Sequence, residues 1–149
     1  MRESKGQTLI EILAAFGVAV VLVTAISIAV LSALSNAQFS KNQNLATQYA
    51  QEGMETVRRF AALSPGDYCL DKNSKNSSDL RLKGTGCGRN IDGIFTREIT
   101  IEENSSKCLD TKKVTALVSW SDSKCTSSND CHKAELVSCL PDINAVPIP

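Results

Sequence analysis

The chain opens with a long apolar block and continues as a polar remainder. Residues 12–34, ILAAFGVAVVLVTAISIAVLSAL, contain no charge and no proline, and their only polar interruptions are Thr24, Ser27 and Ser32. A helix needs about 20 apolar residues to cross the hydrocarbon core of a bilayer, and this block is long enough. A water-soluble helix that is apolar on every side would need a much larger protein around it. The block therefore predicts a membrane-spanning helix.

A secretory signal peptide is the main alternative for this block. Ser35 and Ala37 are small residues in the positions required for cleavage after Ala37, which would leave Gln38 as the first residue. The apolar region of such a signal usually has about 7 to 15 residues, and this block exceeds that length. The helical pattern also continues beyond the block, which favours a spanning helix.

The residues after the block extend the helix. Between Asn36 and Leu63 there is no proline and only one glycine. Small and apolar side chains recur there at spacings of three and four, as in an amphipathic helix with one buried stripe: Ala46, Tyr49, Ala50, Gly53, Val57, Phe60 and Ala61. The whole pattern predicts one helix from about Thr8 to Leu63, on the order of 80 Å long. Ser64, Pro65 and Gly66 would end it.

Three later segments have the alternation of β-strands: residues 95–103, 113–120 and 133–140. In the first, Phe95, Ile99 and Ile101 share one face, and Arg97 is an exception on that apolar side. Joined by two loops, the segments predict an antiparallel meander that covers the buried stripe of the helix. The expected fold class is α+β, a long N-terminal helix packed on a small antiparallel sheet. Residues 67–93, rich in Ser, Asn, Lys, Asp and Gly, are interpreted as a long connecting loop.

The charged residues before the apolar block predict which end of the helix lies in the cytoplasm. Arg2 and Lys5 precede the apolar block, so the positive-inside bias puts the N-terminus in the cytoplasm and the rest of the chain outside it. Over the 149 residues, Lys plus Arg and Asp plus Glu number 16 each. This balance gives no strong field for nucleic acid, and no nucleic-acid partner is expected.

The cysteines predict a disulfide-stapled head. All six follow the apolar block, in the part expected to be extracytoplasmic: Cys69, Cys87, Cys108, Cys125, Cys131 and Cys139. In a three-stranded meander the end of the third strand lies near the start of the second, which brings Cys139 toward Cys108. Cys125 and Cys131 face each other across the second loop, and Cys69 pairs with Cys87. The last pair would restrict the unfolded chain by about 3 kcal/mol.

Catalytic and metal sites are not predicted. His132 is the only histidine, and it is interpreted as an exposed loop residue beside Cys131. The serines and aspartates lack a nucleophile-elbow frame, and there is no C-x-x-C pair of the kind that binds zinc. The expectation is a protein that is not an enzyme and has no cofactor.

One short motif at the head of the apolar block points to a particular protein family. Gly6, Gln7, Thr8, Leu9, Ile10 and Glu11 follow a short basic leader and run directly into the long helix. This arrangement resembles the prepilin processing motif of type IV pilins and type II secretion pseudopilins. The stretch LATQYAQEGMETVRR also looks like the corresponding helix of minor pilins of the pilus-modification group. The resemblance implies a pilin-like fold.

The resemblance also implies roles for three residues. A membrane-embedded prepilin peptidase would cut after Gly6, and the new first residue, Gln7, would become N-methylated. Glu11, the fifth mature residue, would pair with the N-terminal amine of a neighbouring subunit as a filament assembles. A carboxylate at the edge of the hydrocarbon costs a few kcal/mol when it is unpaired, so only a correctly staggered neighbour would neutralise it. Glu11 could therefore set the register of assembly.

Two departures from the major-pilin pattern favour a minor subunit. The first mature residue is Gln7, where that family usually has Phe, and the block lacks the proline found inside many pilin helices. The implied organisation is a leader over 1–6, a transmembrane and filament-core helix over 7–35, an amphipathic helix over 36–63 and an extracytoplasmic β-rich head over 64–149. The chain would be a single-pass protein of the cytoplasmic membrane and then part of a pilus or a periplasmic pseudopilus.

The implied partners are prepilin peptidase, other pilin or pseudopilin subunits, membrane lipid before assembly and an inner-membrane assembly platform. The primary expectation is a minor subunit of a type IV pilus, with a type II secretion minor pseudopilin as the alternative. A second alternative is a tip adhesin or DNA-capture pilin that binds through Trp120 or through Lys72, Lys75 and Lys83. A third is an anchored or secreted domain unrelated to filaments. The N-terminal residue of the mature protein distinguishes the third from the others.

Overall fold

The computed structural model describes residues 5–60, 64–72, 80–84, 86–103, 106, 108, 111–122, 125–126 and 130–141, with the backbone alone for residues 5–8. Within these residues the fold is α+β, as predicted, with one helix, α1 (Lys5–Arg59), and a five-stranded antiparallel sheet. The chain divides into two units after Ser40. The first unit contains α1 up to Ser40. The second, called the head below, contains the rest of α1 and the whole sheet.

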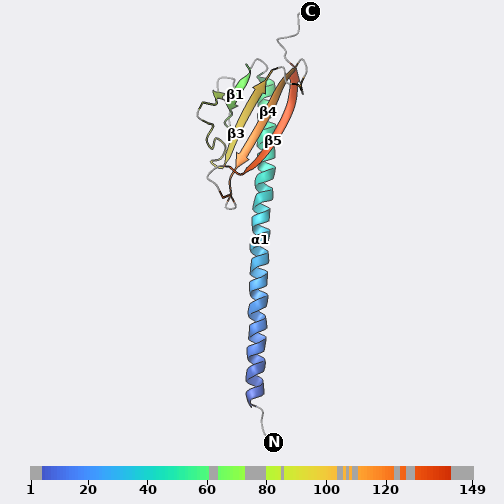
Figure 1. Cartoon of the computed structure of the whole chain (residues 1–149), viewed down its shortest axis with the longest axis vertical. Coiled ribbons are helices and arrows are strands. Elements are labelled where there is room, and N and C mark those ends of the chain that lie inside the picture. The colour runs from blue at the N-terminus through green and yellow to red at the C-terminus, as the bar shows by residue number, and fades with distance from the viewer. Residues whose placement is uncertain are drawn as a thin grey trace, which may run out of the picture. The chain divides into compact units, whose positions relative to one another are not determined.

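The sheet has the strand order β2-β1-β3-β4-β5, with every neighbouring pair antiparallel. Its strands are β1 (Gly66–Cys69), β2 (Arg81–Leu82), β3 (Phe95–Glu102), β4 (Thr111–Trp120) and β5 (His132–Pro141). Figure 1 shows β3, β4 and β5 as adjacent arrows beside the last turns of α1. These three strands are the predicted meander, with ends that shift by one or two residues.

The predicted loop over 67–93 is wrong in part, because β1 and β2 lie inside it. β1 pairs with β3 from Gly66↔Ile101 to Cys69↔Glu98, and β2 pairs with the other edge of β1. β1 has four residues, among them Gly and Asp, and β2 has only two, so both strands are too short to show an alternation of apolar and polar residues. Their strand conformation comes from pairing, of β1 with β3 and of β2 with β1, which the local sequence does not encode.

Small side chains let α1 lie close to β3. Ala46 and Ala50 are completely buried, and they share the stripe with Gly53, Met54 and Val57. A Cβ atom added at Gly53 would lie 3.1 Å from Arg97 Cδ and 3.2 Å from Ile99 Cδ1, which is tighter than ordinary packing. The described part of the predicted stripe therefore faces the sheet, and a larger residue at its glycine would force the Arg97 or Ile99 side chain to shift.

The C-terminus of α1 comes earlier than predicted. The helix ends at Arg59, and the Phe60 amide donates to the Val57 carbonyl at 3.0 Å, which tightens the last turn. Arg58 and Arg59 lie in that turn, where positive charge is favourable to the helix dipole. Ala61 and Leu63 of the predicted helix lie outside the described residues.

Three disulfides close the head, and they are the three predicted pairs. They join Cys69 to Cys87, Cys108 to Cys139 and Cys125 to Cys131, with Cα–Cα distances of 5.2, 5.5 and 5.7 Å. The first pair is buried and ties β1 to the segment before β3. A domain of this size has a limited core, and covalent links of this kind supplement it by restricting the unfolded chain.

Candidate functional site

The first candidate site is the apolar surface of α1 in the first unit. Between Leu9 and Leu34, fifteen large apolar side chains are 48% to 70% exposed, on all sides of the helix. Leu9–Arg59 is the one helix among the described residues that contains a stretch long and apolar enough to cross a membrane. None of that stretch is buried within the chain. A core helix of a soluble protein would be covered by its own domain, so this surface needs lipid or other chains to cover it.

Two of the three polar residues inside this stretch are compatible with an apolar environment. The Thr24 hydroxyl lies 2.9 Å from the Val21 carbonyl and 3.1 Å from that of Val20, and the Ser27 hydroxyl donates to the Val23 carbonyl at 2.8 Å. These bonds satisfy the two hydroxyl donors within the helix itself. Thr24 and Ser27 therefore require no partner outside the helix.

The residues of the predicted processing motif lie in the first turns of α1. The backbone is helical from Lys5 onward, and Gly6 and Gln7 fall in the part for which only the backbone is described. Glu11 is exposed, one turn after Gln7, and positions four apart share a face of a helix. Positions 7 and 11 therefore share one face at the start of α1.

Arg97 is the principal buried charge of the head. Its side chain is 1% exposed, and it donates to three backbone carbonyls: Leu70 at 3.0 Å, Tyr49 at 2.9 Å and Asp71 at 2.8 Å. Burial lowers the pKa of Arg97, while the nearby carboxylates of Glu52 and Asp71 act in the opposite direction. One guanidinium therefore joins α1, β3 and the segment after β1. The sequence pattern showed its apolar position but not the carbonyls that it binds.

A tight turn before β3 places a second polar group against α1. Asp92 and Gly93 have φ angles of 48° and 69°, a left-handed pair that Asp-Gly adopts readily. The turn directs the Asp92 carboxylate to the Tyr49 hydroxyl at 2.6 Å and to Lys72 Nζ at 2.7 Å. The hydrogen bond to Asp92 raises the pKa of Tyr49 above 10.0, and desolvation adds to that. The Asp-Gly dipeptide is a signal that the sequence analysis missed.

Replacing Asp92 by Asn is expected to lower the pKa of Tyr49 toward 10.0, because the hydrogen bond to the carboxylate is its main cause. Asn also tolerates the left-handed conformation, so the turn is retained. Absorbance titration of the phenolates measures the shift, and Tyr49→Phe separates Tyr49 from Tyr68, the only other tyrosine. In the parent protein, as the pH rises, Tyr49 loses its phenolic proton in the unfolded chain before it does so in the folded one. The stabilisation from Tyr49 is therefore complete below pH 10.0 and declines above it. An unchanged Tyr49 pKa in Asp92→Asn would contradict this assignment.

Of the surface expected for an adhesin, the structure contradicts the part at Trp120 and leaves the lysine part as a prediction. Trp120 is fully buried, so it cannot offer its ring to a ligand. Lys72 pairs with Asp92, and Lys83 with Glu98 at 2.6 Å, which reduces the charge that both present. Lys75 lies outside the described residues. The prediction of a Trp120 binding surface is wrong because the alternation of β4 turns this residue toward the core.

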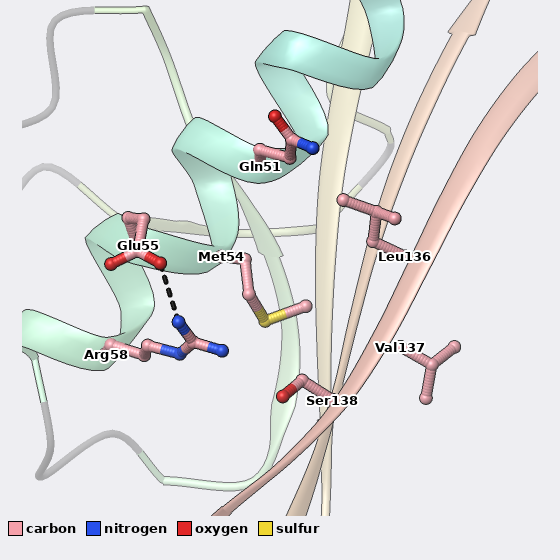
Figure 2. Close-up of a pocket in the computed structure, with 7 residues that line it drawn as sticks. All are labelled: Gln51, Met54, Glu55, Arg58, Leu136, Val137 and Ser138. Atoms are coloured by element: carbon pink, nitrogen blue, oxygen red, sulfur yellow. Dashed lines mark hydrogen bonds and ion pairs between the residues drawn. The ribbon is translucent and has the colours of Figure 1, made fainter.

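A small open cavity of about 240 Å³ lies between α1 and the edge strand β5. Figure 2 shows its lining: Gln51, Met54, Glu55, Arg58, Leu136, Val137 and Ser138. Arg58 and Glu55 pair at 2.6 Å, so the two charged groups of the cavity satisfy each other. The cavity is smaller than the sites of about 300 Å³ and more that hold typical ligands, and we assign it no ligand.

The turn between β4 and β5 gathers a cluster that the sequence analysis did not predict. Asp122, Cys125, Cys131 and His132 each contribute a potential ligand atom, and these atoms lie within 4.8 Å of one another. The prediction that His132 is an exposed loop residue is wrong. His132 is the first residue of β5 and is partly buried. Its ring lies 5.4 Å from that of Trp120, with which it forms a register pair. The pairing of the strands moves His132 out of the loop.

No protein-family model, curated protein or solved structure matches this chain. The assignment of function therefore rests on the residues and the geometry described above.

Proposed function

We propose that this chain is a minor structural subunit of a type IV pilus-like filament. It is inserted in the cytoplasmic membrane through the first unit of α1, cleaved after Gly6 by a prepilin peptidase, and assembled by packing of its N-terminal helix against neighbouring subunits. The observation that carries the proposal is the exposed apolar helix that directly follows the predicted processing motif and contains Glu11 at its start.

The physical argument begins with the uncovered surface of α1. Leu, Ile, Val and Phe side chains exposed on all sides cannot remain in water, so lipid covers them before assembly. In a filament, the same surface can exchange lipid for the equivalent helices of other subunits. The helix carries no charge from Ile12 to Leu34, so this exchange requires no desolvation of charge along the block.

The organisation of the head supports the same proposal. The head has its own core, around Phe95 and Trp120, and its own three disulfides. It therefore does not need the first unit of α1 for its core, which leaves that unit available for packing between subunits. Glu11, at the start of the apolar block, is the only charged residue in this surface.

Intact-mass measurement of the mature protein tests the proposal. Co-expression with a prepilin peptidase is expected to give a chain that begins at Gln7. Gly6→Val should block this cleavage, because the peptidase binds the backbone closely at that position. Ala37→Leu is the matched control, because it removes the small residue that a signal peptidase requires and should leave the Gln7 terminus unchanged. A terminus at Gln38, or an uncleaved Met1, would contradict the proposal.

A further inference from the structure

The cluster at the β4–β5 turn has the composition of a metal site. The four potential ligand atoms are the sulfurs of Cys125 and Cys131, an imidazole nitrogen of His132 and a carboxylate oxygen of Asp122. Thiolate, imidazole and carboxylate are the groups that bind Zn²⁺ in proteins, usually four at a time in a tetrahedron. In the disulfide form the two sulfurs are bonded to each other and are not thiolates.

The distances fit a tetrahedral ion once the disulfide is opened. With Zn–S near 2.3 Å and Zn–N or Zn–O near 2.0 Å, neighbouring ligand atoms of a tetrahedron are about 3.3–3.8 Å apart. All four atoms already lie within 4.8 Å of one another. The two cysteine Cα atoms are 5.7 Å apart, so their sulfurs can separate to the tetrahedral distance by side-chain rotation. Apart from the two sulfurs, which must move apart, no pair of ligand atoms has to approach by more than about 1.5 Å to complete the set.

Contacts other than the disulfide hold the ligands in place. The register pair Trp120↔His132 fixes where the turn begins and ends. The Asp122 amide donates to Cys125 Sγ at 3.3 Å, and the Cys125 amide donates to the Asp122 carbonyl at 3.2 Å. An amide aimed at a sulfur stabilises a thiolate. These bonds place Asp122 beside Cys125 without any contribution from Cys131.

A second set of contacts supports the same turn from outside. The Ser119 hydroxyl lies 3.1 Å from the Asp130 carboxylate, and Arg89 donates to the Ser121 hydroxyl at 2.7 Å. Two thiolates and one carboxylate would leave a Zn²⁺ complex with one net negative charge. Arg89, which bonds to Ser121, also lies 3.9 Å from the Asp130 carboxylate, so its positive charge is shared with that group.

We propose that the reduced β4–β5 turn binds one Zn²⁺ ion through Asp122, Cys125, Cys131 and His132. A dithiol reductant opens the Cys125–Cys131 disulfide by thiol–disulfide exchange and becomes a disulfide itself, which leaves two thiols on the protein. Binding of Zn²⁺ then releases the two thiol protons to solvent. Thiol–disulfide exchange with a disulfide oxidant, which is itself reduced to a dithiol, re-forms the Cys125–Cys131 disulfide and expels the ion. The turn is thus closed by metal in the reduced protein and by a disulfide in the oxidised one, independently of any role in a filament.

Cobalt titration of the full chain in detergent micelles tests this proposal. The protein is reduced, freed of reductant without oxygen and titrated with Co²⁺, which replaces Zn²⁺ and reports tetrahedral thiolate ligands by its absorption bands. We expect one equivalent to bind, to be displaced by Zn²⁺ and to quench the fluorescence of Trp120, the only tryptophan, whose ring contacts that of His132. The oxidised protein should show none of these changes.

Variants assign the site. Cys125→Ser with Cys131→Ser should abolish the thiolate–cobalt bands although four other cysteines remain. His132→Gln and Asp122→Asn should each weaken Zn²⁺ binding at least about tenfold, since the loss of a supporting partner alone has that effect. Both retain every cysteine, so their folding is verified in the oxidised state. Glu135→Gln, an exposed carboxylate on the same strand, is the matched control and should bind normally. Bands that persist in the double serine variant, or reduced protein that shows no bands, would overturn the proposal.

Discussion

Replacing Arg97 by Ala is expected to destabilise the head by about 3–5 kcal/mol, the cost of breaking a buried charged group away from its partners. Three backbone carbonyls lose a donor in this variant, and the side chain that fills the space between α1 and β3 is removed. A few kcal/mol is a large part of the stability of a small domain. The free energy of unfolding, followed through the fluorescence of the buried Trp120 in denaturant, measures the loss.

Two variants separate the role of Arg97 from a general effect of charge. Arg81→Ala removes an exposed arginine whose pair with Asp71 is 3.1 Å long, and it should change stability by less than about 1 kcal/mol. Arg97→Lys keeps the charge but lacks the planar fork that reaches three acceptors, so its loss should fall between the two. Equal stability of Arg97→Ala and Arg81→Ala would show that the carbonyl contacts are not important for the fold.

Arg97 also shows where sequence reasoning succeeds and fails. Alternation along β3 placed Arg97 on the apolar side, and the structure confirms that side. Its acceptors belong to Tyr49, Leu70 and Asp71, which are far away in the sequence. No local pattern predicts which carbonyls a tertiary fold will leave for a buried guanidinium. The same limitation applies to β1, because its conformation depends on its pairing with β3.

The elements that were predicted are those with strong local periodicity. The stripe of Ala46, Ala50 and Gly53 recurs at helical spacing and faces the sheet. The meander has period two in all its strands, and its antiparallel order fixes which loops approach one another. That order also determines the disulfide between Cys108 and Cys139, because Cys139 pairs in register with Lys113 near the start of β4. Topology could therefore supply the cysteine pairing.

The candidate site could be predicted only in part. The apolar block and Glu11 can be read directly from the sequence, because a membrane helix is specified by composition alone. The cluster of Asp122 and His132 could not, because these residues are brought together by strand register. In the proposed assembly, the partner that neutralises Glu11 belongs to a neighbouring subunit, so neither the sequence nor the fold of one chain contains it.

Replacing Glu11 by Gln is expected to abolish incorporation into filaments while leaving membrane insertion intact. In the proposed assembly, Glu11 compensates the N-terminal ammonium of a neighbouring subunit within the apolar layer. Removing one member of a buried pair costs about 3–5 kcal/mol, because the other charge is left without a partner. This corresponds to a loss of roughly a hundredfold or more at each subunit contact. Gln has the same shape as Glu, so helix packing is otherwise preserved.

The amount of the protein in sheared filaments, relative to the membrane fraction, measures this effect. Intact mass must show a normal terminus at Gln7, so that a loss of filaments reflects assembly and not processing. Glu55→Gln is the matched control, because it makes the same chemical change on the same helix at an exposed pair with Arg58 in the head. That pair is worth little, and incorporation should remain normal. Glu11→Gln protein that enters filaments as efficiently as Glu55→Gln protein would show that a buried charge pair does not set the register of the subunits.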